Sequence, residues 1–165
     1  MTVRLEDPEA RLQHGRDVAW QALNRRERTV AEMARLLAAK RVEPSAIETV
    51  VAELCEQGYL DDAVYAHRFA EDRRRLDAWG AERIERKLLS LGVDRDVIAA
   101  AVGEQDHVEE MEAALELLAR RFPQPPETPR DRDRALGMLV RKGYELELAH
   151  DALRRHAGVA GESLD

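Results

Sequence analysis

The chain has 165 residues, a mass of 18.7 kDa and a formal net charge of −7, because 33 acidic residues outnumber 26 lysines and arginines. This length suffices for one compact domain or for several small units that share a core. No apolar run approaches the roughly 18 residues that cross a bilayer, the N-terminal residues lack the apolar centre of a signal peptide, and a single cysteine excludes an internal disulfide framework or a cysteine-rich zinc module. We therefore expect a soluble cytoplasmic protein.

The composition predicts an all-α protein. Alanine, leucine, glutamate and arginine, which favour helices, are abundant, whereas β-branched and aromatic residues are scarce. Apolar residues recur with helical spacing in short segments that glycine, proline or aspartate interrupts, and about nine such segments follow one another. In chain order their apolar stripes are Val18–Leu23, Met33/Leu36/Leu37, Ile47/Val50/Val51/Leu54, Tyr65/Phe69, Ile84/Leu88, Val97/Ile98/Ala101/Val102, Val108/Met111/Leu115/Leu118/Phe122, Leu136/Leu139/Val140 and Leu148/Ala149/Ala152/Leu153.

The stripes repeat along the chain. A shift of 51 residues superposes Leu37 on Leu88 and then on Leu139, and the same shift superposes Gly92 on Gly143. One three-helix unit of this size hardly buries its own apolar face, so repetition in tandem is the economical solution. We therefore predict three tandem three-helix, helix-turn-helix-like repeats in an elongated, curved molecule.

The predicted repeats span three consecutive ranges: residues 17–60, 61–105 and 106–158. Four prolines within 123–134 predict a flexible loop inside the third repeat. Residues 1–16 are expected to form a loose N-terminal segment, and residues 159–165 a C-terminal tail.

Charge alternates along the chain, so the net value hides local patches. Residues 43–62 carry six acids and no base, whereas residues 68–87 carry seven bases and five acids. Residues 94–116 then carry eight acids and one base, and residues 117–142 carry seven bases and three acids. The basic stretches are candidates for binding phosphate or an acidic protein surface.

The sequence predicts neither catalysis nor a metal or cofactor site. Asp61 and Asp62 are interpreted as carboxylates that cap the start of a helix rather than as a catalytic pair. The five histidines are scattered, and His67 with Glu71 fits a solvated helix face better than a metal site. Cys55 is expected to be a core thiol. Four isolated glycines are interpreted as helix stops rather than as a phosphate-binding loop: Gly58, Gly80, Gly92 and Gly143.

Basic side chains are the candidate contacts to a partner. Arg83, Arg86 and Lys87 lie on the early and middle turns of one helix and form a cationic stripe. Residues 73–75 lie toward a helix C-terminus, where cations stabilise the terminal carbonyls, so a structural role is the alternative for them. The full set of candidates is Arg68, Arg73, Arg75, Arg83, Arg86 and Lys87 in the second repeat, with Arg141 and Lys142 in the third.

The aromatic residues are interpreted mainly as packing. Tyr59 and Tyr144 each follow a glycine at an expected helix end, where the ring can cover the last turn. Trp20 is expected in the core, whereas Trp79 is expected to be exposed at a loop and to anchor an interface.

Short segments in collinear order carry a resemblance over residues 17–158. They are Ala22-Leu23, Glu32-Met33, Leu37, Gln57-Gly58-Tyr59-Leu60-Asp61-Asp62, Tyr65, Arg68, Phe69, Arg73, Gly80-Ala81-Glu82-Arg83-Ile84, Leu88, Gly92-Val93, Ala119-Arg120-Arg121-Phe122 and Leu139-Val140-Arg141-Lys142-Gly143-Tyr144. With these segments the chain resembles the RecX family, the regulators of the bacterial RecA recombinase. The GYLDD segment between two repeats and the later RKGY segment carry most of the likeness.

The resemblance implies three tandem three-helix repeats and a non-enzymatic protein without a cofactor. It implies that the protein binds along the RecA–DNA filament and mainly inhibits the ATPase, strand-exchange and co-protease activities of RecA in recombination and the SOS response. The protein is expected to act as a monomer and to contact the RecA filament first and single-stranded DNA second, because a net charge of −7 disfavours strong binding to free DNA.

Two other functions stay open at this point. A helix-turn-helix transcriptional regulator would need a basic recognition helix, whereas residues 94–102 are acidic; salt-dependent, sequence-selective binding to duplex DNA would favour it. A general helical adaptor without a nucleic-acid role is the second alternative. Arg41 departs from the repeat pattern, because Gly92 and Gly143 occupy its position in the other repeats, and a different helix end is therefore expected there.

Overall fold

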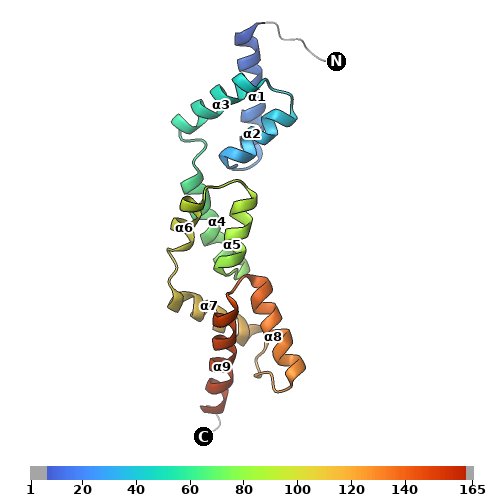
Figure 1. The fold of residues 1–165 in the computed structure, drawn as a ribbon, viewed down its shortest axis with the longest axis vertical. Coiled ribbons are helices and arrows are strands. Elements are labelled where there is room, and N and C mark those ends of the chain that lie inside the picture. Colours follow the sequence, from blue (N-terminus) through green and yellow to red (C-terminus); the bar gives the residue numbers. More distant parts are fainter. Residues whose placement is uncertain (1–6, 163–165) are drawn as a thin grey trace. The chain divides into compact units, whose positions relative to one another are not determined.

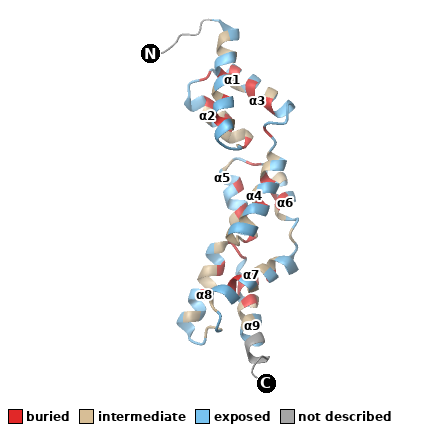
Figure 2. Cartoon of the chain, turned by 180° about the vertical axis from the view of Figure 1, so that it is seen from behind, coloured by how far each residue is buried: buried red, intermediate tan, exposed pale blue. Residues whose placement is uncertain are grey.

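The computed structural model describes residues 7–162, and within this range it contains nine helices and no strand (Figure 1). The helices are α1 Pro8–Arg25, α2 Val30–Ala39, α3 Pro44–Glu56, α4 Asp62–Asp77, α5 Ala81–Ser90, α6 Arg95–Val102, α7 His107–Arg121, α8 Pro129–Lys142 and α9 Leu146–Glu162. Buried and exposed residues alternate along them as amphipathic helices require (Figure 2). The predicted all-α class is confirmed.

The helices form two compact units. Within the described residues, the first unit comprises residues 7–66 and 88–97, and the second comprises residues 67–87 and 98–162. The middle repeat is thus shared, because parts of α4, α5 and α6 belong to each unit.

The first unit has its core where α1, α2 and α3 pack against one another. Met33 and Leu37 on α2 are fully buried, and Val50 on α3 is almost fully buried. A Cβ atom at Gly15 would lie only 3.2 Å from Val42 and 3.3 Å from Val50, so α1 approaches closely at this residue. Arg16 on α1 also donates two hydrogen bonds, of 2.9 and 2.8 Å, to the Glu53 carboxylate on α3.

The prediction of a loose segment at residues 1–16 is wrong for residues 8–16, because α1 already begins at Pro8. Asp7 caps this helix by accepting a hydrogen bond from the Glu9 N–H at 3.2 Å, and Pro8 occupies the first helical position, where no backbone donor is lost. Residues 1–6 lie outside the described range. The tail expected from residue 159 is also shorter, since α9 continues to Glu162, and residues 163–165 lie outside the description.

The second unit has its core around α7, α8 and α9, where α9 packs against both other helices. Leu118 and Leu139 are fully buried, and Tyr144, in the turn between α8 and α9, is 1% exposed. The loop expected at residues 123–134 ends earlier, because α8 starts at Pro129. The Thr128 hydroxyl accepts a hydrogen bond from the Asp131 N–H at 3.1 Å and fixes that start.

Residues with positive φ end several helices, as predicted for Gly92 (φ 78°) and Gly143 (φ 100°). The expectation that Arg41 gives a differently shaped end is wrong, because its φ of 60° lies in the same left-handed region. Gly80 is not the residue that ends α4. That role belongs to Ala78, which has a φ of 54°, while Gly80 directly precedes α5.

Three expectations about individual side chains need correction. Cys55 is exposed and is not a core thiol. Trp20 is 37% exposed and therefore does not belong to the buried core. Asp61 caps α4 as predicted, accepting from the Val64 N–H at 3.2 Å, but Asp62 accepts from the Val30 N–H at 2.9 Å and so caps α2 instead.

Candidate partner-binding surface

In the first unit, the end of α5 contacts the start of α2. The buried Thr29 hydroxyl donates a 2.6 Å hydrogen bond to the Leu91 carbonyl, and the same oxygen accepts one from the Glu32 N–H at 3.1 Å. A Cβ atom at Gly92 would lie 2.3 Å from the Cβ of Ala31, which is closer than any real contact. The two segments can therefore approach this closely only because residue 92 has no side chain.

In the second unit, the end of α8 contacts the start of α5 at equivalent positions. The Gly80 N–H donates to the Lys142 carbonyl at 2.8 Å, and the Glu82 N–H donates to the Gly143 carbonyl at 3.0 Å. A Cβ atom at Gly143 would lie 2.3 Å from the Cβ of Arg83. Gly80, Lys142 and Gly143 are 51 residues beyond Thr29, Leu91 and Gly92, so both contacts use the same positions of the repeat.

Trp79 directly precedes Gly80, which forms part of this second contact. The Arg83 guanidinium is 4.1 Å from the Trp79 ring centroid, and the Arg73 guanidinium is 5.9 Å from it. The Phe69 ring packs edge-on against Trp79 with the centroids 6.0 Å apart. Trp79 is half-buried, so the exposed anchor expected there is instead largely engaged within the unit.

Three of the eight candidate basic residues have structural roles around Trp79. Arg73 forms a 2.5 Å ion pair with Asp77, and Lys142 donates to the Asp77 carbonyl at 2.8 Å. Arg83 donates to the Arg141 carbonyl at 3.1 Å, at the last turn of α8. Arg83 and Lys142 thus satisfy carbonyls at helix ends, whereas Arg73 pairs with a carboxylate of its own helix.

The other five candidates are exposed: Arg68, Arg75, Arg86, Lys87 and Arg141. Arg68 and Arg75 are seven residues apart and therefore share one face of α4. Arg75 lies 3.7 Å from Asp72, and Arg86 donates to the Glu82 carbonyl at 3.4 Å. Both distances are long for an ion pair or a hydrogen bond. Arg86 and Lys87 present adjacent cations on α5.

Arg74 is not one of the eight candidates, yet its side chain is partly buried in the second unit. Its guanidinium donates to the Val102 carbonyl at 2.7 Å, and burial lowers its pKa. The hydrogen bond joins α4 to the end of α6 across 28 residues of sequence, which no local pattern reveals. His67 likewise reaches Glu104, 2.8 Å away, rather than Glu71.

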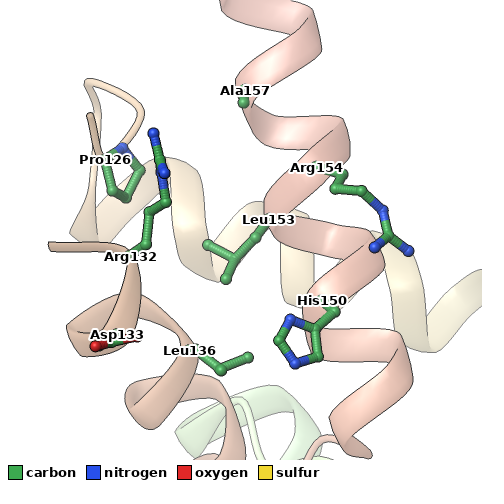
Figure 3. Close-up of a pocket in the computed structure, with 8 residues that line it drawn as sticks. All are labelled: Pro126, Arg132, Asp133, Leu136, His150, Leu153, Arg154 and Ala157. Atoms are coloured by element: carbon green, nitrogen blue, oxygen red, sulfur yellow. The ribbon is translucent and has the colours of Figure 1, made fainter. Parts of the chain in front are cut away.

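A surface hollow of about 470 Å³ lies between α8 and α9 in the second unit. Figure 3 shows Leu136 and Leu153 between the two helices, with Arg132 beside Pro126 and His150 near Leu136. Arg132 also donates to the Glu127 carbonyl at 2.8 Å and so holds the preceding loop. The hollow was not predicted, because it depends on how α9 packs against α8.

Within residues 7–162, no group of three histidine, cysteine or acidic side chains could hold a metal ion. In the same range, no helix is both long and apolar enough to cross a membrane. The candidate contacts on the described surface are exposed charges, exposed aromatic and aliphatic side chains and the hollow between α8 and α9.

The fold and this surface define an all-α protein of three tandem three-helix domains with exposed basic side chains in its second unit. Family models for the first, second and third three-helix domains of RecX match residues 16–54, 61–102 and 108–153. The chain belongs to the RecX family of regulatory proteins. The predicted three-repeat organisation is confirmed, while the predicted boundaries stay a prediction.

Relatives and solved structures agree with this assignment. The chain is 35% identical to Regulatory protein RecX of Leptothrix cholodnii over 129 residues, covering 78% of this chain and 80% of the relative. It is 29% identical to Regulatory protein RecX of Thermobifida fusca over 160 residues, covering 96% and 86%. The crystal structure of RecX from Lactobacillus salivarius matches with a TM-score of 0.79 at 17% identity, over 90% of this chain and 97% of that one, and so supports the fold.

Proposed function

We propose that this protein binds the RecA–DNA filament and restrains its ATPase, strand-exchange and co-protease activities in recombination and the SOS response. Membership of the RecX family, over all three domains, is the observation that carries the proposal. The protein acts as a monomer in the cytoplasm, where filament and DNA are found, and it acts by binding rather than by catalysis.

The proposed contacts are the exposed members of the basic set: Arg68, Arg75, Arg86, Lys87 and Arg141. Arg83 and Lys142 have a structural role instead, because their side chains bond carbonyls of another helix, and Arg73 pairs with Asp77 inside α4. With a net charge of −7, long-range attraction to free DNA is weak, so the filament's protein surface comes first and its single-stranded DNA second.

The test is RecA ATP hydrolysis on single-stranded DNA, with RecA from the same source and this protein titrated in at substoichiometric ratios. We expect the rate of ATP hydrolysis to fall already at ratios well below one regulator per RecA subunit. Such a result would also favour capping or breakage of filaments over uniform coating. A flat response from protein with an intact helical circular dichroism signal would overturn the proposal. Sequence-selective binding to duplex DNA would then favour a transcriptional regulator.

The contact residues are tested by the double variant Arg86→Glu/Lys87→Glu. These side chains are exposed, so the helical signal should stay unchanged while inhibition weakens by about tenfold or more, since like charges now face an acidic or phosphate surface. Arg83 is left intact, because it holds the end of α8. The matched control Arg130→Glu/Arg155→Glu also changes exposed bases and shifts the formal charge from −7 to −11, and it should inhibit like the wild type. Equal loss in both variants would show that only net charge matters.

A further inference from the structure

Two exposed aromatic rings pack against each other on the first unit. Trp20 on α1 is 37% exposed, and Tyr59, directly after α3, is 55% exposed. Their ring centroids lie 4.6 Å apart with the planes at 76°, an edge-to-face arrangement. Because the two rings cover each other only in part, apolar ring surface stays exposed. Tryptophan and tyrosine are typical anchors of protein interfaces.

The backbone holds this pair in place. The Tyr59 N–H donates to the Leu54 carbonyl at 2.9 Å, and the next residue, Leu60, is only 2% exposed. The two hydrogen bonds between Arg16 and Glu53 fix α1 against α3, with Arg16 one turn before Trp20 and Glu53 six residues before Tyr59. The rings are therefore presented on a rigid surface, which keeps the entropy cost of binding low.

Acidic residues flank both rings in the sequence. Glu56 precedes Tyr59 by three residues, and Asp61 follows it by two, and both are exposed. Asp17 lies three residues before Trp20 on the same side of α1. The charge of Arg16 is balanced by Glu53, which it contacts at 2.8 Å. Burial, with the negative charges of Asp62 and Asp61, raises the pKa of the neighbouring Cys55 thiol.

This combination selects one chemical class of partner. Aromatic side chains that stack on single-stranded nucleic acid usually lie in positively charged grooves. Here the neighbouring carboxylates would repel the phosphates, so nucleic acid is disfavoured as the ligand of this pair. The faces of aromatic rings attract lysine and arginine, and the adjacent carboxylates attract the same cations. We propose that Trp20 and Tyr59, with Glu56 and Asp61, form a docking site for a protein segment that presents arginine or lysine.

Under the proposed function, on which this deeper assignment of the partner rests, the segment belongs to the protein part of the filament. The first unit then engages protein through an acidic aromatic surface, while the exposed basic side chains of the second unit are available for phosphate or acidic groups. The two surfaces are chemically opposite, so substitutions in each should affect binding to different components of the filament.

The first measurement does not need the filament. The full chain, labelled with ¹⁵N, is titrated with a hexa-arginine peptide and, separately, with a hexaglutamate peptide, and the indole N–H signal of Trp20 is followed. We expect a saturable shift with hexa-arginine that is weakened several-fold in Glu56→Lys and retained in the control Glu48→Lys, an exposed acid on the same helix. No shift with hexa-arginine, or an equal shift with hexaglutamate, overturns the docking site.

The second measurement uses RecA filaments on poly(dT), with binding of labelled protein read by anisotropy. Trp20→Ala and Tyr59→Ala should each bind about tenfold more weakly or worse, as hot-spot residues do. Leu146→Ala, which removes another exposed apolar side chain, should bind like the wild type. If the wild type binds and both aromatic variants bind equally well, the docking site is wrong and the proposed function stands. If the wild type does not bind although hexa-arginine shifts Trp20, the proposed function fails and the docking chemistry stands. A larger loss of binding to free poly(dT) than to filaments would reveal a base-stacking platform and overturn the assignment.

Discussion

Gly58 and Gly92 offer a matched test of why the helix ends carry glycine. Both belong to the first unit and have almost the same positive φ, 81° and 78°. A Cβ atom at Gly58 would meet nothing within 4 Å, whereas one at Gly92 would lie 2.3 Å from the Cβ of Ala31. Replacing each glycine by alanine therefore imposes the same backbone strain, and only Gly92→Ala adds a steric clash.

The expected costs differ because the clash adds to the strain. A left-handed conformation costs a residue with a Cβ atom about 1–2 kcal/mol, and this is the whole expected effect of Gly58→Ala. At Gly92 the neighbouring backbone must also move by more than about 1 Å to reach ordinary contact, and such overpacking costs about 1–3 kcal/mol more. Gly92→Ala should therefore destabilise the first unit by about 2–5 kcal/mol in total.

The measurement is urea unfolding followed by circular dichroism at 222 nm. With a slope of about 2 kcal/mol per molar, the extra loss moves the midpoint by about 0.5–1.5 M below that of Gly58→Ala. Ala31→Gly removes the atom that clashes, and the next atom near a Cβ at residue 92 on Ala31 is its Cα at 3.8 Å. The double variant should therefore recover most of the extra loss. Equal midpoints for the two glycine variants, or no recovery with Ala31→Gly, would refute the argument.

Further predictions follow from three other residues. Arg41→Gly should raise stability by about 0.5–1 kcal/mol in the same urea assay, because arginine at a φ of 60° bears strain that glycine does not; a loss of stability would contradict this. Thr29→Ala should cost about 1–2 kcal/mol more than Thr128→Ala, since both remove a cap but only Thr29 also bonds the Leu91 carbonyl; equal losses would show that this bond adds nothing. Tyr144→Phe should cost about 1–2 kcal/mol at pH 7, because it leaves the Ala78 carbonyl without its 2.9 Å hydrogen bond. Burial raises the pKa of Tyr144 to about 12, above the unfolded value near 10, so the wild type should lose stability as the pH rises from about 10 to 12, and Tyr144→Phe should flatten that decline in urea midpoints measured across this range.

The sequence predicts the number of helices and their repetition well, because both depend on local spacing. The stripe Ile47/Val50/Val51/Leu54 with Pro44 at its start places α3 over Pro44–Glu56, as found. The missed starts of α1 and α8 have local causes too: Asp7-Pro8 and Thr128-Pro129 are each a capping residue followed by a proline at the first helical position. Pro129 is counted among the loop prolines of residues 123–134 and Asp7 is not considered as a cap, so both helix starts are missed.

The roles of the basic residues could not be predicted in the same way. Arg83 bonds a carbonyl 58 residues away, and Lys142 bonds one 65 residues away, so both contacts depend on the packing of separate repeats. Arg86 differs from Arg83 by less than one helical turn, yet it is exposed and its guanidinium donates to the Glu82 carbonyl of its own helix. Charge and helical position alone therefore do not separate a structural cation from one available to a partner.

Arg41 separates two reasons for glycine that the repeat pattern combines. Its φ shows that a helix end of this shape can be made with a side chain present, at the cost of some strain. Gly92 and Gly143 occupy the same position of the repeat, and at each of them a Cβ atom would lie 2.3 Å from a neighbouring segment. Glycine is thus required where another repeat contacts the helix end, and the exposed Arg41 belongs to the first repeat, which no repeat precedes in the described chain. A glycine or a bulky residue at this one position therefore indicates whether the end of the second helix of a repeat is packed or open.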